Sequence, residues 1–443
     1  MNIQLSEHFT YRKLLRFTLP SMVMMVFTSI YGVVDGVFVS NFVGSASFAA
    51  VNLIMPFLMI LGAVGFMLGA GGSALVAFTL GTGDEKRANE IFSLLIYVLI
   101  GLGAAFTVAG ILFMEPMARF LGADEAMLPV CVQYGRVVLT ALVPFMLQNT
   151  FQSFLVTAER PHFGLYITIA AGVSNMALDA LFIAGFHWGV TGAALATAIS
   201  QFIGGVIPLV YFPLPNKSRL RLCRAGWDGR ALARACTNGS SEFMTNISMS
   251  VVNMLYNWQL MRLMGADGVA VFGVIMYVNF IFVSIFLGYS MGSAPVVGYH
   301  FGAGDREELQ GLLRRSLRLV GVMGAVLTAL ALLLARPLSM IFVSYDAALL
   351  TVTVRAFSIY ALSFLLVGFN IFSSAFFTAL NDGFTSALIS FARTLVFEAA
   401  AVLVLPLVAG IDGVWASVIA AEALALILSA ACLVRNRKKY GYA

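Results

Sequence analysis

The chain has 443 residues, of which 60% are hydrophobic and only 11% are charged, and its mean hydropathy is +0.93. Because an ordinary soluble protein carries roughly 25% charged residues, this composition excludes a soluble fold. The net charge of +5 does not indicate nucleic-acid binding, since the basic residues lie almost wholly on one side of the expected helices. The sequence is that of a polytopic membrane protein.

Twelve apolar segments are each long enough to cross a bilayer as a helix. They are continuous and rich in Leu, Ala, Val, Phe and Gly, whereas barrel strands would alternate in polarity. We expect them at 14–40, 49–79, 90–114, 127–157, 162–186, 189–212, 236–263, 269–300, 309–335, 348–378, 383–408 and 412–434. The predicted fold class is an all-α membrane protein with twelve transmembrane helices.

Most of the 26 Lys and Arg residues fall in the connections on the side of the N-terminus. By the positive-inside rule, both termini are therefore expected in the cytoplasm of a multi-pass protein of the plasma (inner) membrane. The N-terminus is polar up to Arg16, and the first apolar segment is too long for the core of a signal peptide. We expect this segment to stay as a helix.

An internal repeat relates the two halves of the chain at a constant offset of 221 residues. The matched pairs include Gly81/Gly302, Gly83/Gly304, Asp84/Asp305, Pro116/Pro337, Asn149/Asn370, Gly189/Gly410 and Gly192/Gly413. Each half has six spans, so both halves enter the membrane in the same orientation. We expect a six-helix bundle at 1–212, a basic cytoplasmic linker at 213–234 and a second six-helix bundle at 235–443. The linker is interpreted as a solvated loop, with binding of anionic lipid head groups as the alternative.

Ionisable side chains inside the spans indicate a structural or functional role, because placing each charge in lipid costs from ~3 to above 10 kcal/mol of free energy. At ~1.5 Å per residue from the outer ends of their spans, Asp35, Asp179 and Thr197 share one level. Asn175 lies one helical turn from Asp179. These oxygen ligands suit either sodium or a proton shared between two carboxylates. We predict an ion site there, with a polar network that only fixes helix packing as the alternative.

A second charged group, Arg393, Glu398 and Glu422, lies in the last two spans. An Arg among acids is explained most simply as a structural cluster that holds the second half together. Glu242, near the start of the seventh span, could meet a cationic substrate or face cytoplasmic water. Weaker candidates for the lining of a substrate cavity are Met25, Asn149, Gln152 and Tyr256.

The sequence lacks the motifs of several common enzymatic and metal-binding activities. No Lys follows a Gly, so no phosphate-binding loop of the ATPase type is present, and the four histidines form no metal-ligand spacing. The four cysteines show no paired spacing. We expect no enzymatic activity, no cofactor, no ATP and no metal site apart from the possible sodium, so that transport would draw on an ion gradient.

The sequence resembles the multidrug and toxic compound extrusion (MATE) family of secondary antiporters. The resemblance rests on residues 34–39 (Val-Asp-Gly-Val-Phe-Val), on residues 80–84 (Leu-Gly-Thr-Gly-Asp), on Pro20, on Asn175 with Asp179, and on the repeat. It implies two six-helix bundles that export bulky, often cationic drugs in exchange for sodium or protons. It also implies that Asp35, Asn175, Asp179 and Thr197 couple the ion and that Pro20 bends the first helix. The eighth span has no acid at residues 276–279, so a second-bundle ion site of the kind found in one family branch is not implied.

We therefore expect an ion-coupled exporter of cationic, amphipathic small molecules. The alternative from the related superfamily is a flippase for a lipid-linked precursor, whose cavity should hold several basic residues for pyrophosphate. Here only Arg393 and the span-end Arg136 and Arg355 are available.

Overall fold

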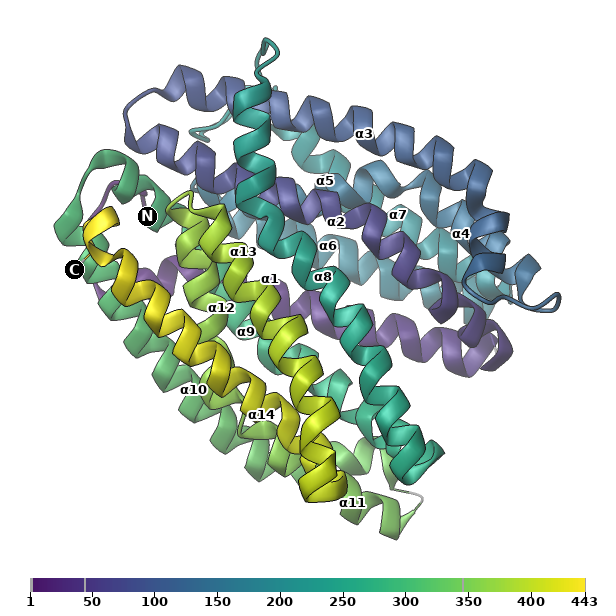
Figure 1. The fold of residues 1–443 in the computed structure, drawn as a ribbon. Helices are drawn as coiled ribbons and strands as arrows, with labels where there is room; N and C mark the ends of the chain where they lie inside the picture. The colour runs from purple at the N-terminus through teal and green to yellow at the C-terminus, as the bar shows by residue number, and fades with distance from the viewer. Residues whose placement is uncertain (1–2, 44, 345, 443) are drawn as a thin grey trace.

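The structure, a computed structural model, describes residues 3–43, 45–344 and 346–442, and every regular element within these ranges is a helix. The first half comprises α1 (Tyr11–Phe38), α2 (Ser45–Gly81), α3 (Glu85–Phe120), α4 (Leu128–Thr140), α5 (Leu142–Thr157), α6 (Pro161–Asp179) and α7 (Gly189–Tyr211). The second half comprises α8 (Gly229–Met264), α9 (Ala266–Ala303), α10 (Arg306–Val343), α11 (Ala347–Ala361), α12 (Phe364–Ala379), α13 (Gly383–Phe391) and α14 (Glu398–Tyr440). Three π-helical segments are η1 (Val39–Val43), η2 (Ala180–Gly185) and η3 (Ala392–Phe397). Figure 1 shows both termini at the same end of the helices, which is called the terminal side below.

These helices make twelve crossings in the described part of the chain. Eight helical segments are individually long and apolar enough to span a membrane, and α4 with α5 and α11 with α12 form two more spans that are bent at a break. The helix α8 is the eleventh, although its Glu and Asn residues make it more polar than the rest. The twelfth arises because α14 is two helices joined at Gly410, whose φ is 58°. The fold class predicted from the sequence is confirmed.

The internal repeat is visible in the backbone. Gly189 (φ 56°) and Gly410 (φ 58°) turn the chain between the last two spans of each half, and they are 221 residues apart. The bend at Ala141 in the first half is 55°, and that near Leu362 in the second is 45°, again at the same offset. A glycine is required at the two turns because a positive φ is costly for any residue with a Cβ atom.

Two features differ from the sequence prediction. The spans expected at 127–157 and 348–378 are each broken in two, and neither Ala141 nor Leu362 is a residue that ends helices by itself. In addition, α8 begins at Gly229, where Asp228 caps it by accepting hydrogen bonds from the N–H groups of Arg230 and Ala231. The non-helical connection is therefore 212–228, shorter than the expected linker.

Glycines bring the two halves into close contact near the terminal side. Gly71 of α2 packs on Gly239 of α8, and Gly292 of α9 packs on Thr18 of α1. The two crossings are equivalent under the repeat, because Gly71 corresponds to Gly292 and Thr18 to Gly239. Small residues at both crossings let the backbones approach, as is usual where lipid-embedded helices pack. The halves are thus related by an approximate two-fold axis that runs between α2, α8, α9 and α1.

The start of the chain packs into the half to which it does not belong by sequence. Leu5, Phe9, Leu14 and Phe17 are buried in the apolar core of the second half, while most of the first half has a separate core. Further along, α1 lies against α6, where Tyr31 packs beside Gly172. The helix α1 therefore touches both halves and runs without interruption through Pro20.

Candidate functional site

The two intramembrane aspartates of the first half face each other. Asp35 lies near the end of α1, Asp179 is the last residue of α6, and their carboxyl groups lie within electrostatic reach of each other. Asp179 is fully buried, and Asn175, one turn earlier on α6, is also buried. The structure therefore brings together the two carboxylates that the sequence placed at one depth.

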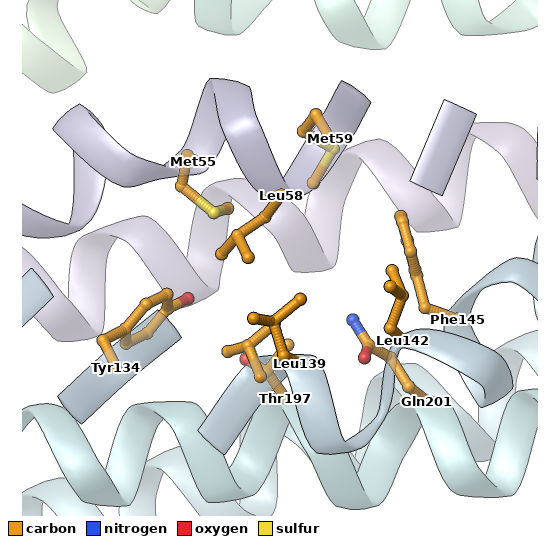
Figure 2. A pocket seen from close by; sticks show the side chains of 10 residues that line it. Met55, Leu58, Met59, Tyr134, Leu139, Leu142, Phe145, Thr197 and Gln201 are labelled. Atoms are coloured by element: carbon orange, nitrogen blue, oxygen red, sulfur yellow. The ribbon is translucent and has the colours of Figure 1, made fainter. Parts of the chain in front are cut away.

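Thr197 of α7 lines a small cavity. The cavity has a volume of about 50 Å³ and lies between α2, the broken span α4–α5, and α7. Figure 2 shows Thr197 and Gln201 facing Met55 and Leu58 across it, with Tyr134 at one end. The Tyr134 side chain is also within electrostatic reach of both aspartates. A space of this size accommodates a water molecule.

Several oxygen atoms at this site have no hydrogen-bond partner among the described residues. They are Oδ1 of Asp35, Oδ1 of Asn175, both carboxylate oxygens of Asp179 and Oγ1 of Thr197. Unpaired buried carboxylates that face each other are costly, and a shared proton or a bound cation removes most of that cost. Carboxylate, amide and hydroxyl oxygens are also the ligands that a hard cation prefers. The residues present therefore fit either sodium or a proton.

π-Helical segments adjoin the intramembrane charges. The segment η1 begins four residues after Asp35, η2 begins directly after Asp179, and η3 contains Arg393 and ends directly before Glu398. A π-helical turn widens the helix and shifts the register of its side chains, and such turns are frequent at functional sites. The helices that carry the charges are thus locally irregular at the points where the charges lie.

The second half holds a different polar cluster. Arg393 Nε lies 2.8 Å from Oε1 of Glu422, and the pair is largely buried. The amide of Asn370 donates to Oε2 of Glu422 at 2.7 Å and to its backbone carbonyl at 2.9 Å. Ser429 in turn donates to Oδ1 of Asn370 at 2.9 Å. Both carboxylate oxygens of Glu422 are therefore satisfied.

Glu398 is not part of that ion pair. Among the described residues Arg393 forms one ion pair, to Glu422, and the Glu398 side chain instead lies beside the buried ring of Tyr256. Tyr256 occupies the position equivalent to Asp35 in the repeat and stacks on Phe272 at 4.7 Å. The cluster predicted from the sequence is thus a satisfied pair, Arg393 with Glu422, plus a separate carboxyl.

The weaker cavity candidates do not gather at one place. Asn149 and Gln152 are buried on α5, and the Asn149 amide donates to the carbonyl of Phe145 in its own helix at 3.0 Å. Met25 lies half-buried on α1, and Glu242 lies half-buried on α8 within electrostatic reach of Arg393. Tyr256 is buried on α8 and lies beside Glu398 in the second half. None of the five lines the cavity between α2, α4–α5 and α7.

Sequence reasoning missed two residues that the structure adds to these clusters. Tyr134 joins the aspartates, and Asn370 joins Glu422. Both left a signal: Tyr134 is about as far from the outer start of its span as Thr197 is from its own, and Asn370 is an amide inside an apolar run. Counting depth for all polar residues would have included Tyr134, whereas Asn370 lies 22 residues from the outer start of its expected span and is too deep by this count to be placed with Glu422.

Two related six-helix halves with ionisable groups buried among their helices define a multi-pass membrane transporter. A sequence model of the MatE family matches residues 20–181 and 243–403, once in each half. The chain therefore belongs to the MatE family, as the resemblance in its sequence predicted.

Relatives and solved structures agree with this assignment. The chain is 23% identical over 424 residues to the multidrug export protein MepA of Staphylococcus haemolyticus, covering 96% of this chain and 93% of the relative. It is similar to an outward-facing structure of a multidrug resistance MATE family transporter of the MOP superfamily, with a TM-score of 0.93, 21% identity and coverage of 100% and 99%. It is also similar to a MOP superfamily transporter from Pyrococcus furiosus, described as having a binding pocket of reverse polarity, with a TM-score of 0.90, 22% identity and coverage of 98% and 96%. At these identities the structures establish the fold alone.

Proposed function

We propose that the protein is an antiporter that exports bulky, mostly cationic compounds across the plasma membrane in exchange for sodium or protons. The observation that carries the proposal is the pair of facing aspartates, Asp35 and Asp179, whose buried oxygens lack partners in the described structure. A membrane protein that retained these charges without using them would bear their full cost.

Coupling follows from linkage. An ion can shift the equilibrium between two conformations only by its difference in affinity for them. Neutralising Asp35 and Asp179 removes their mutual repulsion, and α1, which touches both halves, is the helix on which the change acts. Each elementary charge that flows inward contributes ~2.3 kcal/mol per 100 mV of membrane potential, enough for about a fifty-fold gradient of a neutral solute.

The preference for cations is inferred from the sign of the intramembrane charges. The acids Asp35, Asp179, Glu398 and Glu242 have no ion pair to a basic residue among the described residues, whereas Arg393 is neutralised by Glu422. Such a charge distribution attracts cations and repels anions. One structural neighbour is described as having a binding pocket of reverse polarity, so the fold alone does not determine the charge of the substrate. The preference for cations is therefore inferred from the residues of this chain.

The alternative, a flippase for a lipid-linked pyrophosphate, has less support. Its cavity would need free basic groups, but Arg393 is paired with Glu422 and Arg355 is paired with Asp412. Multidrug export is the activity named for the MepA relative. We therefore propose a transporter without enzymatic activity or ATP dependence, oriented with both termini in the cytoplasm.

The proposal is tested by efflux of ethidium from cells that express the chain. A protonophore should stop efflux if protons are the coupling ion, and removal of sodium should stop it if sodium is. Efflux that continues under both conditions would contradict ion coupling. Preferential uptake of anionic conjugates over quaternary ammonium compounds into inverted vesicles would contradict the proposed substrate class.

A further inference from the structure

The connection between α7 and α8, residues 212–228, runs along one face of α3. The backbone N–H of Arg221 donates to Oδ1 of Asn89 at 2.7 Å, and that of Cys223 donates to Oγ of Ser93 at 2.9 Å. The hydroxyl of Tyr97 donates to the carbonyl of Cys223 at 3.1 Å. Asn89, Ser93 and Tyr97 are four residues apart, so they form one stripe on α3. The connection is therefore fixed to a membrane-spanning helix.

This attachment carries the connection down to the level of the membrane surface. The apolar part of α3 begins after Glu90, and Tyr97 lies about 10 Å further along the helix axis. Tyr97 is 48% exposed on the outside of the bundle. Tyr and Trp in such positions mark the boundary between lipid head groups and acyl chains. The backbone at Cys223 thus lies at the depth of that boundary.

The chain then returns toward the start of α8. Asp228, which caps α8, forms an ion pair with Arg87 at the beginning of α3. Figure 1 shows the loop that leads into α8 standing clear of the helices at the top of the picture. Residues 224–227 therefore form a turn that is tied to α3 at both ends and open to its surroundings.

The exposed side chains of residues 221–230 are three arginines and a tryptophan, named here the linker patch: Arg221, Arg224, Trp227 and Arg230. Trp227 is 75% exposed. The neighbouring Arg219 is excluded from the patch, because it forms ion pairs with Glu85 and Glu159 and lies over the ring of Tyr299. Asp228, the acid of the region, is already bound to Arg87, so the charge of the patch is not compensated within the described residues.

We infer that the linker patch binds the head groups of anionic phospholipids in the surrounding bilayer. Guanidinium groups bind phosphate oxygens through paired hydrogen bonds, and an exposed indole is stabilised at the head-group level. A loop that is merely solvated needs neither an exposed Trp nor three hydrogen bonds to a lipid-facing helix. Because the connection lies along α3 at the level of the lipid head groups, we take the surrounding membrane as the partner.

The test compares the full-length wild type with Arg221→Gln/Arg224→Gln/Arg230→Gln by native mass spectrometry in detergent micelles containing phosphatidylglycerol or phosphatidylcholine. The wild type should retain phosphatidylglycerol in preference to phosphatidylcholine. Each neutralised arginine should weaken phosphatidylglycerol binding about fivefold, and binding of phosphatidylcholine should not change. The triple lysine variant at the same positions keeps the charge but not the paired hydrogen bonds, so it should bind phosphatidylglycerol more weakly than the wild type and more tightly than the glutamine variant.

A matched control neutralises three exposed basic residues elsewhere on the terminal side, in Arg435→Gln/Arg437→Gln/Lys438→Gln at the end of α14. An equal loss in this control would show that net charge alone attracts the lipid and would overturn the inference. Contact is tested separately with phosphatidylglycerol brominated on its acyl chains, which quenches tryptophans near the bilayer. Trp227→Phe should lower the quenched fraction of the fluorescence; an unchanged fraction would place Trp227 away from lipid and would also overturn the inference.

Discussion

Arg393 donates to Glu422 at 2.8 Å across the last two spans of the second half, and Asn370 occupies the other carboxylate oxygen at 2.7 Å. The pair connects η3 to the second part of α14, and Asn370 extends it to α12. An ion pair whose hydrogen-bonding groups are satisfied in this way fixes the packing of three helices in a medium without water.

Glu422→Gln should lower the stability of the folded protein sharply. The substitution keeps a partner for Asn370 but leaves the Arg393 charge without a counterion, and breaking a buried pair on one side costs about 3–5 kcal/mol. The measurement is the folded yield in detergent together with the apparent Tm. Efflux per folded molecule should change much less than the yield.

Two further variants isolate the pair. Arg393→Gln/Glu422→Gln removes both charges and should recover most of the lost stability. Glu398→Gln, which touches no ion pair in the described structure, should leave the yield close to that of the wild type. If Glu398→Gln lowers the yield as much as Glu422→Gln does, the two carboxyls act as one unit and the separation made above is wrong.

Gly239→Ala should disturb the contact between the halves. A methyl group at this position would overlap the carbonyl oxygen of Met67 on α2, which is backbone and cannot rotate away. Overpacking of this kind costs about 1–3 kcal/mol. We expect a lower apparent Tm and faster labelling of a cysteine introduced at Ser241, which is buried near the same crossing. Gly101→Ala is the control, because a methyl group there meets nothing within 4 Å, and equal effects of both variants would exclude the crossing as the cause.

Tyr440→Phe should release the end of α14 from the loop before α13. The Tyr440 hydroxyl donates to Oδ2 of Asp382 at 2.6 Å, and Thr385 donates to the same carboxylate through its N–H and hydroxyl groups. Burial alone would raise the pKa of Asp382, but these hydrogen bonds and the nearby charge of Lys439 outweigh it and hold the pKa below its usual value of 3.8. A lowered pKa in the folded state stabilises the protein above the usual value, and this contribution is lost as the pH falls through the folded pKa.

The corresponding measurement is hydrogen exchange of residues 430–442 between pH 3 and 6. Protection, corrected for the slower intrinsic exchange at low pH, should fall in the wild type as the pH falls below about 4. Tyr440→Phe should already be less protected at pH 6, since a hydrogen bond to a charged group contributes about 1.5–3 kcal/mol. Asp382→Asn keeps a residue that can cap α13 and should remove the pH dependence in this range. A pH dependence that persists in Asp382→Asn would assign the effect to another group.

The proximity of Asp35 and Asp179 could be predicted from the sequence, because the rise of a helix is constant and apolar spans have recognisable ends. The two-fold relation of the halves could be predicted because glycines at turns and crossings keep their spacing. Other features left no such signal. The breaks at Ala141 and Leu362 lie at residues with no intrinsic tendency to end a helix, so packing against neighbouring helices determines them.

The side-chain partners in the second half could not be predicted from the sequence either. Glu398 and Glu422 share a depth, yet Arg393 forms its ion pair with Glu422 in the described structure, and the π-helical segment η3 lies between Arg393 and Glu398. Counting at a constant 3.6 residues per turn cannot anticipate a π-helical segment. Depth is therefore predictable from one sequence, whereas the direction in which a side chain points near such a segment is not.

Asp35→Asn and Asp179→Asn should each abolish transport against a gradient while leaving folding and substrate binding nearly unchanged. Asn keeps the size and hydrogen-bonding capacity of the side chain but cannot take up a proton, and it removes half of the charge that would attract a cation. Neither carboxylate is ion-paired in the described structure, so no opposite charge is left exposed by the change. Each variant should therefore bind ethidium but fail to concentrate it outside the cell.

Thr197→Ala distinguishes the coupling ion. If sodium is bound, the hydroxyl oxygen of Thr197 would be one of its ligands, whereas two facing carboxylates can share a proton without it. If sodium is the ion, the sodium concentration needed for half-maximal efflux should rise about ten- to a hundredfold, since a lost hydroxyl contact to a charged group corresponds to about 1.5–3 kcal/mol. If the proton is the ion, efflux should keep its dependence on the pH gradient. Ser200→Ala, one turn further along α7, is the matched control, because its hydroxyl already donates to the backbone carbonyl of Thr197 at 2.8 Å. Wild-type efflux against a gradient by both aspartate variants would place the coupling site outside the first half. Glu398, a carboxyl of the second half that has no ion pair among the described residues and lies beside Tyr256, would then be the next residue to neutralise.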